Sequence, residues 1–437
     1  MKLEAIYGRA YINHQLIDST IYINELGFIE KIERGSPHGS LNSKILKLPK
    51  EWIILPGIID IHVHFRDWEL SYKETLESGS AAAAYGGVVL AIDMPNTKPE
   101  LNSIEKIRMR LNNAEGRLYI DYWVYSGIPN DVNEVKAICS SNLVAGFKVY
   151  PRDLKKHTFP KIMKTILDQN YLVIIHSEMP WVEERCMLAE LGARYICRSR
   201  ASMKECIDYI LNISSRTVST NQRLRIHVTH IPYHQLAAYV KEKLCTTDTC
   251  MHYVLLNSEH EALGCRFKVN PPLAPLNEQL KMLKAIMENY IDVISSDHAP
   301  HSENEKNYTY HTCPPGIAGI EATYRLLFTL VKRGILSLRK FVLLTSINPS
   351  KILNIHELFG SISLGKVASF TIINPKEFGR IYGSKYSRAY FTGFEGLNYE
   401  GEVVMTIVRG YIAYEAGIGL SSPKGITMPK IINLRNP

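Results

Sequence analysis

The chain's 437 residues exceed the roughly 100 to 200 residues of a usual domain, and 46% of them are hydrophobic, so it can bury a large core. The formal net charge is +8, but the lysines and arginines are scattered, which argues against a nucleic-acid partner and suits attraction for a small acidic substrate. No apolar stretch approaches the roughly 20 residues needed to cross a bilayer, which excludes a membrane-spanning protein.

The cysteines and the N-terminal sequence indicate the cellular compartment of the protein. The eight cysteines form no CxxC pair, and the N-terminus has no positively charged stretch followed by an apolar core. We therefore expect a cytoplasmic protein with reduced thiols.

The first 50 residues hold short β-branched and aromatic runs, such as 21–23 and 28–32, with Gly and Pro between them. This texture predicts β-strands. It returns after about residue 358, in 369–374 and 403–410. We therefore predict one small β-sandwich domain, built from residues 1–55 and 358–437 together.

Eight apolar runs with many β-branched residues lie between these ends, separated by stretches with helical spacing. They fall near residues 53–61, 87–93, 118–125, 143–150, 171–176, 225–230, 250–256 and 291–296. Eight alternating strands and helices predict an α/β protein with a (β/α)8 barrel over residues 56–357.

Three of the predicted helices rest on particular residues. The run Ala81–Ala84 predicts a helix packed tightly on the barrel, and two further helices follow from apolar residues at steps of three and four. These are Leu276, Leu280, Leu283, Met287 and Tyr290, and Ile320, Tyr324, Leu327 and Val331.

Residue types suited to metal binding stand where the first two runs end. His62 and His64 alternate on one strand, so both point toward the barrel axis, where two imidazoles can hold one metal ion. Taken alone, such a pair is as often structural or incidental. Asn96 ends the second run, where a turn is the ordinary reading.

The fourth run places Lys148 in an otherwise apolar strand. An unpaired ammonium is costly to bury, and a desolvated lysine can react as a free amine with carbon dioxide to give a carbamate that bridges two cations. A lysine at a strand edge or paired with a carboxylate is the alternative, which the rarity of buried lysine favours when this residue is taken alone.

Three more strand ends supply candidate ligands. His176 ends the fifth run, and the sixth contains His227 and His230, which alternation places on opposite sides, so that only one is a ligand. Asp297 ends the eighth run, where it can touch a metal and move protons or simply cap a helix. Convergence of five strands by chance is far less common than one such accident, so we predict a metal site.

Three motifs resemble those of the amidohydrolase superfamily and, within it, the dihydroorotases. They are PGIIDIHVHFRD at 56–67, MPNT at 94–97 and DHAPH at 297–301, and the resemblance runs from about residue 55 to 358. It implies two zinc ions held by His62, His64, carboxylated Lys148, His176, His230 and Asp297. It also implies that Arg66, Asn96 and His301 bind the substrate carboxylate, and that Asn270, Pro315 and Gly316 line the pyrimidine ring.

The activity implied by the resemblance is reversible hydrolysis of the cyclic amide of dihydroorotate to carbamoyl-aspartate, in pyrimidine biosynthesis. A metal-bridged hydroxide would attack, with Asp297 as general base and acid. Two alternatives stay open: a hydantoinase- or allantoinase-like hydrolase with the same metals, and a non-catalytic dihydroorotase-like assembly subunit. A homodimer or an association with another pyrimidine-pathway enzyme is compatible with each of them.

Overall fold

The computed structural model describes residues 2–37, 44–186, 189–190, 192–215 and 224–435. Its strands are β1 (Ala5–Ile12), β2 (Gln15–Ile23), β3 (Ile29–Arg34), β4 (Ile45–Lys47), β5 (Ile53–Pro56), β6 (Ile58–Val63), β7 (Val88–Asp93), β8 (Asp121–Val124), β9 (Phe147–Val149), β10 (Val173–Ile175), β11 (Ile226–Val228), β12 (Thr246–Cys250), β13 (Val293–Ser295), β14 (Phe370–Arg380), β15 (Asn398–Val408), β16 (Tyr411–Glu415) and β17 (Gly419–Leu420).

The α-helices are α1 (Leu76–Tyr85), α2 (Ile104–Asn113), α3 (Val132–Ser141), α4 (Phe159–Asp168), α5 (Pro180–Arg185), α6 (Arg194–Cys197), α7 (Arg200–Ser215), α8 (His234–Glu242), α9 (Met251–Leu255), α10 (Ser258–Glu261), α11 (Leu276–Met287), α12 (Glu303–Lys306), α13 (Ile320–Lys332), α14 (Leu338–Val342), α15 (Asn348–Ile352) and α16 (Met428–Arg435). Among the described residues, no helix is both long enough and apolar enough to span a membrane.

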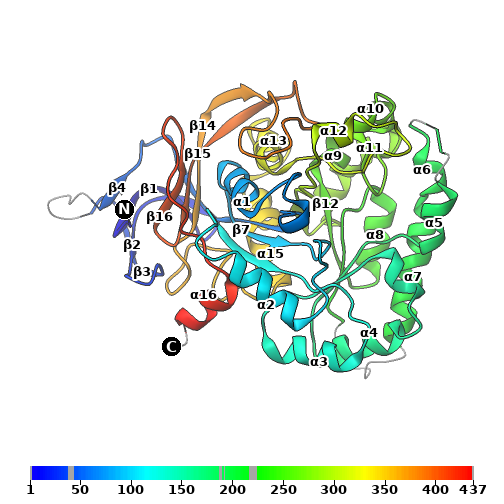
Figure 1. Ribbon diagram of the computed structural model, residues 1–437. Helices are drawn as coiled ribbons and strands as arrows, with labels where there is room; N and C mark the ends of the chain where they lie inside the picture. Colours follow the sequence, from blue (N-terminus) through cyan, green and yellow to red (C-terminus); the bar gives the residue numbers. More distant parts are fainter. Residues whose placement is uncertain (1, 38–43, 187–188, 191, 216–223, 436–437) are drawn as a thin grey trace.

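The two ends of the chain build one sheet together. Nine strands join in the order β17-β16-β15-β14-β5-β1-β2-β3, with β4 on β1, and both chain ends lie on this side of the molecule (Figure 1). Ile6, Ile54 and Phe370, from three of these strands, are buried in a core of the sheet's own. Because hydrogen bonds link all nine strands in a single sheet, the predicted β-sandwich is not confirmed.

The middle of the chain forms parallel sheets with helices between the strands, which confirms the predicted α/β class. One sheet has the order β6-β7-β8 and the other β13-β12-β11-β10-β9, with every pairing parallel. Isolated parallel bridges connect Ser126 to Phe147 and Val63 to His298, so each end of one sheet contacts an end of the other. In parallel strands that run side by side, the carboxyl ends gather on one face, which is where the candidate site lies.

Two of the eight predicted strands differ from the structure. The run 53–61 divides, since Ile53–Pro56 pairs with β14 in the nine-stranded sheet and only Ile58–Val63 joins the parallel strands. Within 250–256, only Cys250 is strand and Met251–Leu255 is helix. A short apolar run fits a buried helix as well as a strand, and here the strand lies earlier, in the polar residues Thr246–Cys250.

The three helices predicted from particular residues are present, and in one of them part of the predicted apolar face is exposed. Ala81–Ala84 are buried in α1, and the apolar residues of α13 face the core. In α11, however, Leu280 is 64% exposed, whereas Met282 and Ile286 are buried. The helix is thus the predicted one, but of the predicted apolar residues only Leu283 and Tyr290 pack against the core.

The prediction of reduced thiols is wrong for half of the cysteines. Disulfides join Cys186 to Cys197 and Cys265 to Cys313, while the four other cysteines are buried and form no disulfide. Spacings of 11 and 48 residues match no local motif, since loops bring these pairs together only in the folded chain.

Candidate active site

A pocket of about 340 Å³ opens at the carboxyl ends of the parallel strands. All twelve residues singled out from the sequence line it, and their roles remain predictions. The lining residues are His62, His64, Arg66, Asn96, Lys148, Tyr150, Pro151, Arg152, His176, Arg198, His230, Asn270, Asp297, Ala299, His301, Pro314, Pro315 and Gly316.

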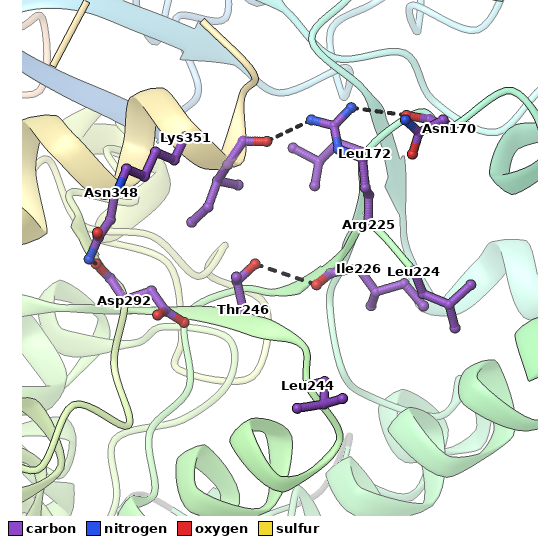
Figure 2. Close-up of a pocket in the computed structure, with 11 residues that line it drawn as sticks. Asn170, Leu172, Leu224, Arg225, Ile226, Leu244, Thr246, Asp292, Asn348 and Lys351 are labelled. Carbon is purple, nitrogen blue, oxygen red and sulfur yellow. Dashed lines mark hydrogen bonds between the residues drawn. The ribbon is translucent and has the colours of Figure 1, made fainter. Parts of the chain in front are cut away.

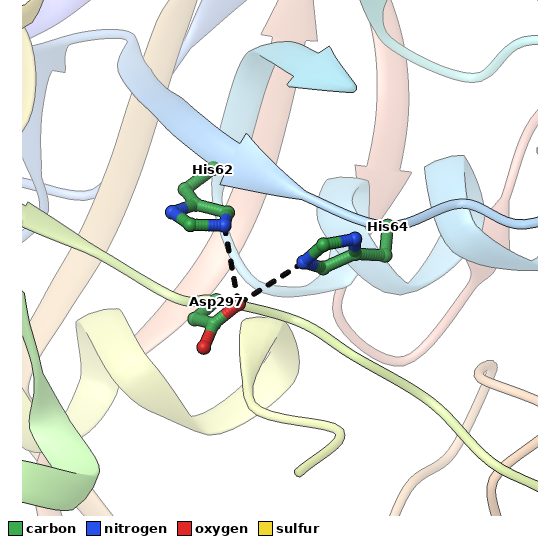
Figure 3. A group of neighbouring side chains, drawn as sticks. All are labelled: His62, His64 and Asp297. Carbon is green, nitrogen blue, oxygen red and sulfur yellow. Dashed lines mark hydrogen bonds and ion pairs between the residues drawn. The ribbon is translucent and has the colours of Figure 1, made fainter. Parts of the chain in front are cut away.

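Two histidines of one strand face one carboxylate at the base of this pocket. His62 lies near the end of β6 and His64 directly after it, and Asp297 follows β13 (Figure 3). Asp297 Oδ1 lies 3.3 Å from Nε2 of His62 and 3.2 Å from Nε2 of His64. The three side chains are buried and offer ligand atoms within 4.8 Å of one another, as a metal ion requires.

Two more imidazoles and an amine complete the cluster. The ring of His230 lies 5.3 Å from that of His62 and 4.6 Å from that of His176, centroid to centroid. Lys148 is fully buried, and burial lowers its pKa to about 7. Among the described residues, neither Lys148 Nζ nor His230 Nδ1 has a hydrogen-bond partner. Buried polar groups are rarely left so, and a cation or a modified lysine would satisfy both.

Neighbouring polar groups fix the orientation of the first two imidazoles. The Nδ1 of His64 lies 2.8 Å from Asn96 Oδ1, and the Nδ1 of His62 lies 2.6 Å from the hydroxyl of Thr229. That hydroxyl donates in turn to Asp248. With each Nδ1 engaged, both Nε2 atoms are directed at the cluster, which is the arrangement that ligating histidines need.

The two histidines of the sixth run have the different environments that strand alternation predicts. His227 is buried away from the pocket, with Nε2 2.8 Å from Asp248 and Nδ1 2.9 Å from Thr246. His230 lines the pocket. His227 is thus a satisfied core residue, and His230 is the member of the pair available to a ligand.

Arg66 brings a positive charge to the pocket without an acidic partner. Its side chain is 92% buried (8% exposed), and of the described carboxylates none forms an ion pair with it. Its nearest polar contact is Nη2 at 3.4 Å from His301 Nε2, and burial lowers the pKa of Arg66. An unpaired buried guanidinium is costly, so this position favours an anionic ligand.

His301 holds the wall beside Arg66. Burial lowers the pKa of His301 to about 3, so the ring is neutral at pH 7. Its Nε2 donates to the carbonyl of Pro315 at 3.0 Å, and its Nδ1 lies 3.2 Å from Lys73 Nζ. At Gly316, with φ of 147°, a Cβ would lie 2.4 Å from the carbonyl oxygen of Ala299, so only glycine fits this turn.

Sequence reasoning missed an arginine that joins the metal-type cluster to the opposite wall. Arg198 donates to both oxygens of Glu178, at 2.7 and 2.8 Å, and to Asn270 Oδ1 at 2.9 Å. Glu178 Oε2 lies 2.5 Å from Nε2 of His176. Although burial alone would raise it, the Arg198 guanidinium holds the pKa of Glu178 well below its usual range. The HSE sequence at 176–178 was the only signal, since a carboxylate two residues from a candidate ligand can orient it.

Strained backbone gathers around the pocket. Arg66, His230 and Asp297 have φ of 50°, 47° and 44°, in the left-handed region that residues with a Cβ rarely adopt. Strain of this kind persists where the surrounding structure holds it, and it concentrates at functional sites.

A larger cavity, of about 580 Å³, lies at the opposite ends of the same strands. Residues just before or at the start of β10 to β13, among them Arg225, Thr246 and Asp292, line it (Figure 2). It contains none of the metal-type clusters of the described residues. The cluster of His62, His64 and Asp297 lies in the smaller pocket.

Comparisons with known proteins identify the family of the chain. The model of the Amidohydrolase family matches residues 53–413. The dihydroorotase of Saccharolobus solfataricus is 35% identical over 93% of this chain and 94% of its own. That of Sulfurisphaera tokodaii is 33% identical, over 94% of both chains.

Solved structures are similar in fold. The L-hydantoinase (dihydropyrimidinase) from Arthrobacter aurescens has a TM-score of 0.88 at 20% identity, covering 98% of this chain and 99% of its own. The D-hydantoinase (dihydropyrimidinase) from Thermus sp. has a TM-score of 0.85 at 21% identity, covering 97% and 98%. At such identities the likeness concerns the fold alone.

Proposed function

The chain belongs to the amidohydrolase family, and we propose that it is a metal-dependent dihydroorotase, which opens the cyclic amide of (S)-dihydroorotate to N-carbamoyl-L-aspartate and can close it again. One observation carries the choice within the family. Arg66 is a buried guanidinium without a carboxylate partner, beside the histidine cluster, and it matches the carboxylate that dihydroorotate has and hydantoin lacks.

The metal centre we propose holds two zinc ions per chain. His62, His64, His176, His230, Asp297 and carboxylated Lys148 would be the ligands. Lys148 fits because its amine, with a pKa near 7, can bond to the carbon of CO₂ and release a proton to give an anionic carbamate. When bound, the cations would supply a water of lowered pKa and polarise the ring carbonyl.

The chain's own groups then bind the substrate and move the proton. Arg66, Asn96 and His301 hold the substrate carboxylate, and the walls formed by Asn270, Pro315 and Gly316 line the pyrimidine ring. Asp297 accepts the proton of the attacking water and delivers it to the ring nitrogen as the C–N bond breaks. His301, neutral and engaged with the carbonyl of Pro315, keeps the wall beside Arg66 in place.

The scaffold we propose is a closed (β/α)8 barrel over residues 56–357, with a separate domain from 1–55 and 358–437. The bridges from Ser126 to Phe147 and from Val63 to His298 support closure, because they join the two parallel sheets at both junctions. The solved hydantoinases with TM-scores of 0.85 and 0.88 support the same architecture.

A three-substrate assay tests the activity. Purified zinc-loaded protein is given dihydroorotate, hydantoin and allantoin separately, and ring opening is followed for each. We expect turnover of dihydroorotate and little or none of the two rings without a carboxylate. Asp297→Asn should lose nearly all activity, and turnover close to the parent's would refute the role of Asp297. Preference for hydantoin would replace the proposal by the hydantoinase alternative.

A further inference from the structure

A second group of metal-type side chains shares Asp297 with the first, and its two other members have no role in the proposed reaction. Cys250 is the last residue of β12, His252 lies in α9 directly after it, and Asp297 follows β13. Because β12 and β13 are parallel, with Cys250 opposite Ser295, the two strand ends lie side by side. The ligand atoms of Cys250, His252 and Asp297 are within 4.8 Å of one another, and all three residues are buried.

His252 points to a ligand independently of that spacing. It is 1% exposed, and neither of its ring nitrogens has a hydrogen-bond partner among the described residues. A neutral imidazole carries one donor and one acceptor, and burying both without partners is unfavourable. A cation bound to one nitrogen would give that nitrogen a partner and lower the cost of burying the ring. A bound ligand therefore accounts for the buried position of His252.

The other two side chains have donor atoms to spare. Asp297 directs Oδ1 at His62 and His64, while its second oxygen points away from both imidazoles (Figure 3). The Cys250 sulfur has one weak polar contact, at 3.5 Å from the Ser295 hydroxyl. A carboxylate can therefore serve the catalytic cluster with one oxygen and the second group with the other.

The combination of donors selects the ion. In a tetrahedral zinc site with bonds of about 2.0 to 2.3 Å, donor atoms lie about 3.3 to 3.8 Å apart, so shifts of about 1 Å would suffice here. Thiolate, imidazole and carboxylate suit Zn²⁺ or Co²⁺, whereas Mg²⁺ and Ca²⁺ prefer oxygen alone. Binding would form a metal–sulfur bond and release the thiol proton to solvent.

We propose that Cys250, His252 and Asp297 form a third cation site for thiophilic divalent ions, and that its occupation inhibits the enzyme by engaging Asp297. The inhibitory part rests on the proposed function, because it needs Asp297 as the proton carrier. The site itself does not depend on that function.

Cobalt titration of the holoenzyme tests the site. Protein carrying its two catalytic metals is titrated with Co²⁺, and absorption is followed in the near ultraviolet, where thiolate-to-cobalt charge transfer appears. The proposed catalytic ligands contain no sulfur, so such a band reports only the third site. We expect one further equivalent with a thiolate band in the parent, no band in Cys250→Ser, and at least about tenfold weaker Co²⁺ binding in His252→Gln.

Cys139→Ser is the matched control, because Cys139 is also buried and free but lies in α3. It should keep the band. Absence of the band in folded parent protein, or a band unchanged in Cys250→Ser, would overturn the site. If Cys250→Ser fails to fold, His252→Gln decides: Co²⁺ binding as tight as in the parent would overturn the site.

Inhibition by added Zn²⁺ tests the consequence. We expect excess Zn²⁺ to slow dihydroorotate opening by the parent and Cys139→Ser, and to slow His252→Gln only at about tenfold higher concentration. Equal inhibition of all three would overturn the inhibitory role. A cobalt–thiolate band in a protein that opens no cyclic amide would instead leave the site standing and refute the proposed function.

Discussion

Replacement of Arg66 by glutamine tests how this pocket recognises its substrate. Removing one partner of a buried charged pair costs about 2 to 4 kcal/mol, which corresponds to a loss of about 30- to 900-fold in kcat/KM for dihydroorotate. The upper part of that range applies, because Arg66 is 8% exposed and water replaces little of the lost contact. Steady-state kinetics with purified, zinc-loaded variants measure the loss.

Arg152 provides the matched control, since it lines the same pocket with its side chain 57% exposed and paired to Glu100. Arg152→Gln should cost at most about 1 kcal/mol, or about fivefold. Arg66→Gln should also leave thermal stability equal or higher, because an unpaired buried charge is removed. Equal kinetic losses in the two variants, with both proteins folded, would refute the reasoning.

Three further predictions concern stability. Arg198→Met leaves Glu178 buried without its guanidinium and should lower the free energy of unfolding by about 3 to 5 kcal/mol in urea denaturation, so a loss below about 1 kcal/mol would contradict the buried pair. Cys313→Ser removes the disulfide to Cys265, which spans 48 residues, and should lower the free energy of unfolding by about 4 kcal/mol. Thiol titration of the unreduced, denatured parent should find four cysteine thiols. Eight thiols would contradict both disulfides. Burial lowers the pKa of Lys306 to about 7, so between about pH 7 and 10 the unfolded chain binds a proton that the folded chain does not. The free energy of unfolding should therefore rise with pH through this range, and it should rise more in the parent than in Lys306→Met. Equal gains in the two proteins would contradict the shift.

The side chains around the pocket were predictable because strand geometry alone decides their direction. His62 in β6 and His64 just after it are two residues apart along an extended segment, so they share a face. The same alternation separates His227 in β11 from His230 just beyond it. The tip of a parallel strand is also a fixed place in the fold. Residue type and position were therefore enough to gather donors from five distant segments.

What the sequence missed depends on contacts between loops. Arg198 lies between α6 and α7, where no period applies, and only the folded chain brings it to Glu178 and Asn270. The disulfide of Cys265 and Cys313 arises in the same way. Spacing along the chain carries no information about such pairs, because loop paths are set by packing of the whole domain.

The length and apolar content of residues 250–256 led to the wrong prediction of a strand, because a short buried helix has the same sequence pattern. Met251–Leu255 is apolar except for His252 and buried except for Leu255, yet it is one helical turn that begins where β12 ends. His252 lies in this turn, and its ligand atom is within 4.8 Å of those of Cys250 and Asp297.

Backbone strain links the fold to the chemistry at the same positions. His230 and Asp297 each follow a short parallel strand and take positive φ, which costs roughly 1 kcal/mol or more for a residue with a Cβ. The contacts that hold them there are specific: the amide of His230 donates to Asp248 at 2.7 Å, and Asp297 faces two imidazoles. A glycine at either position would relax the backbone but remove the ligand. The strain is therefore the cost of turning a ligand from the strand direction into the pocket, and the buried core around β11 and β13 offsets it.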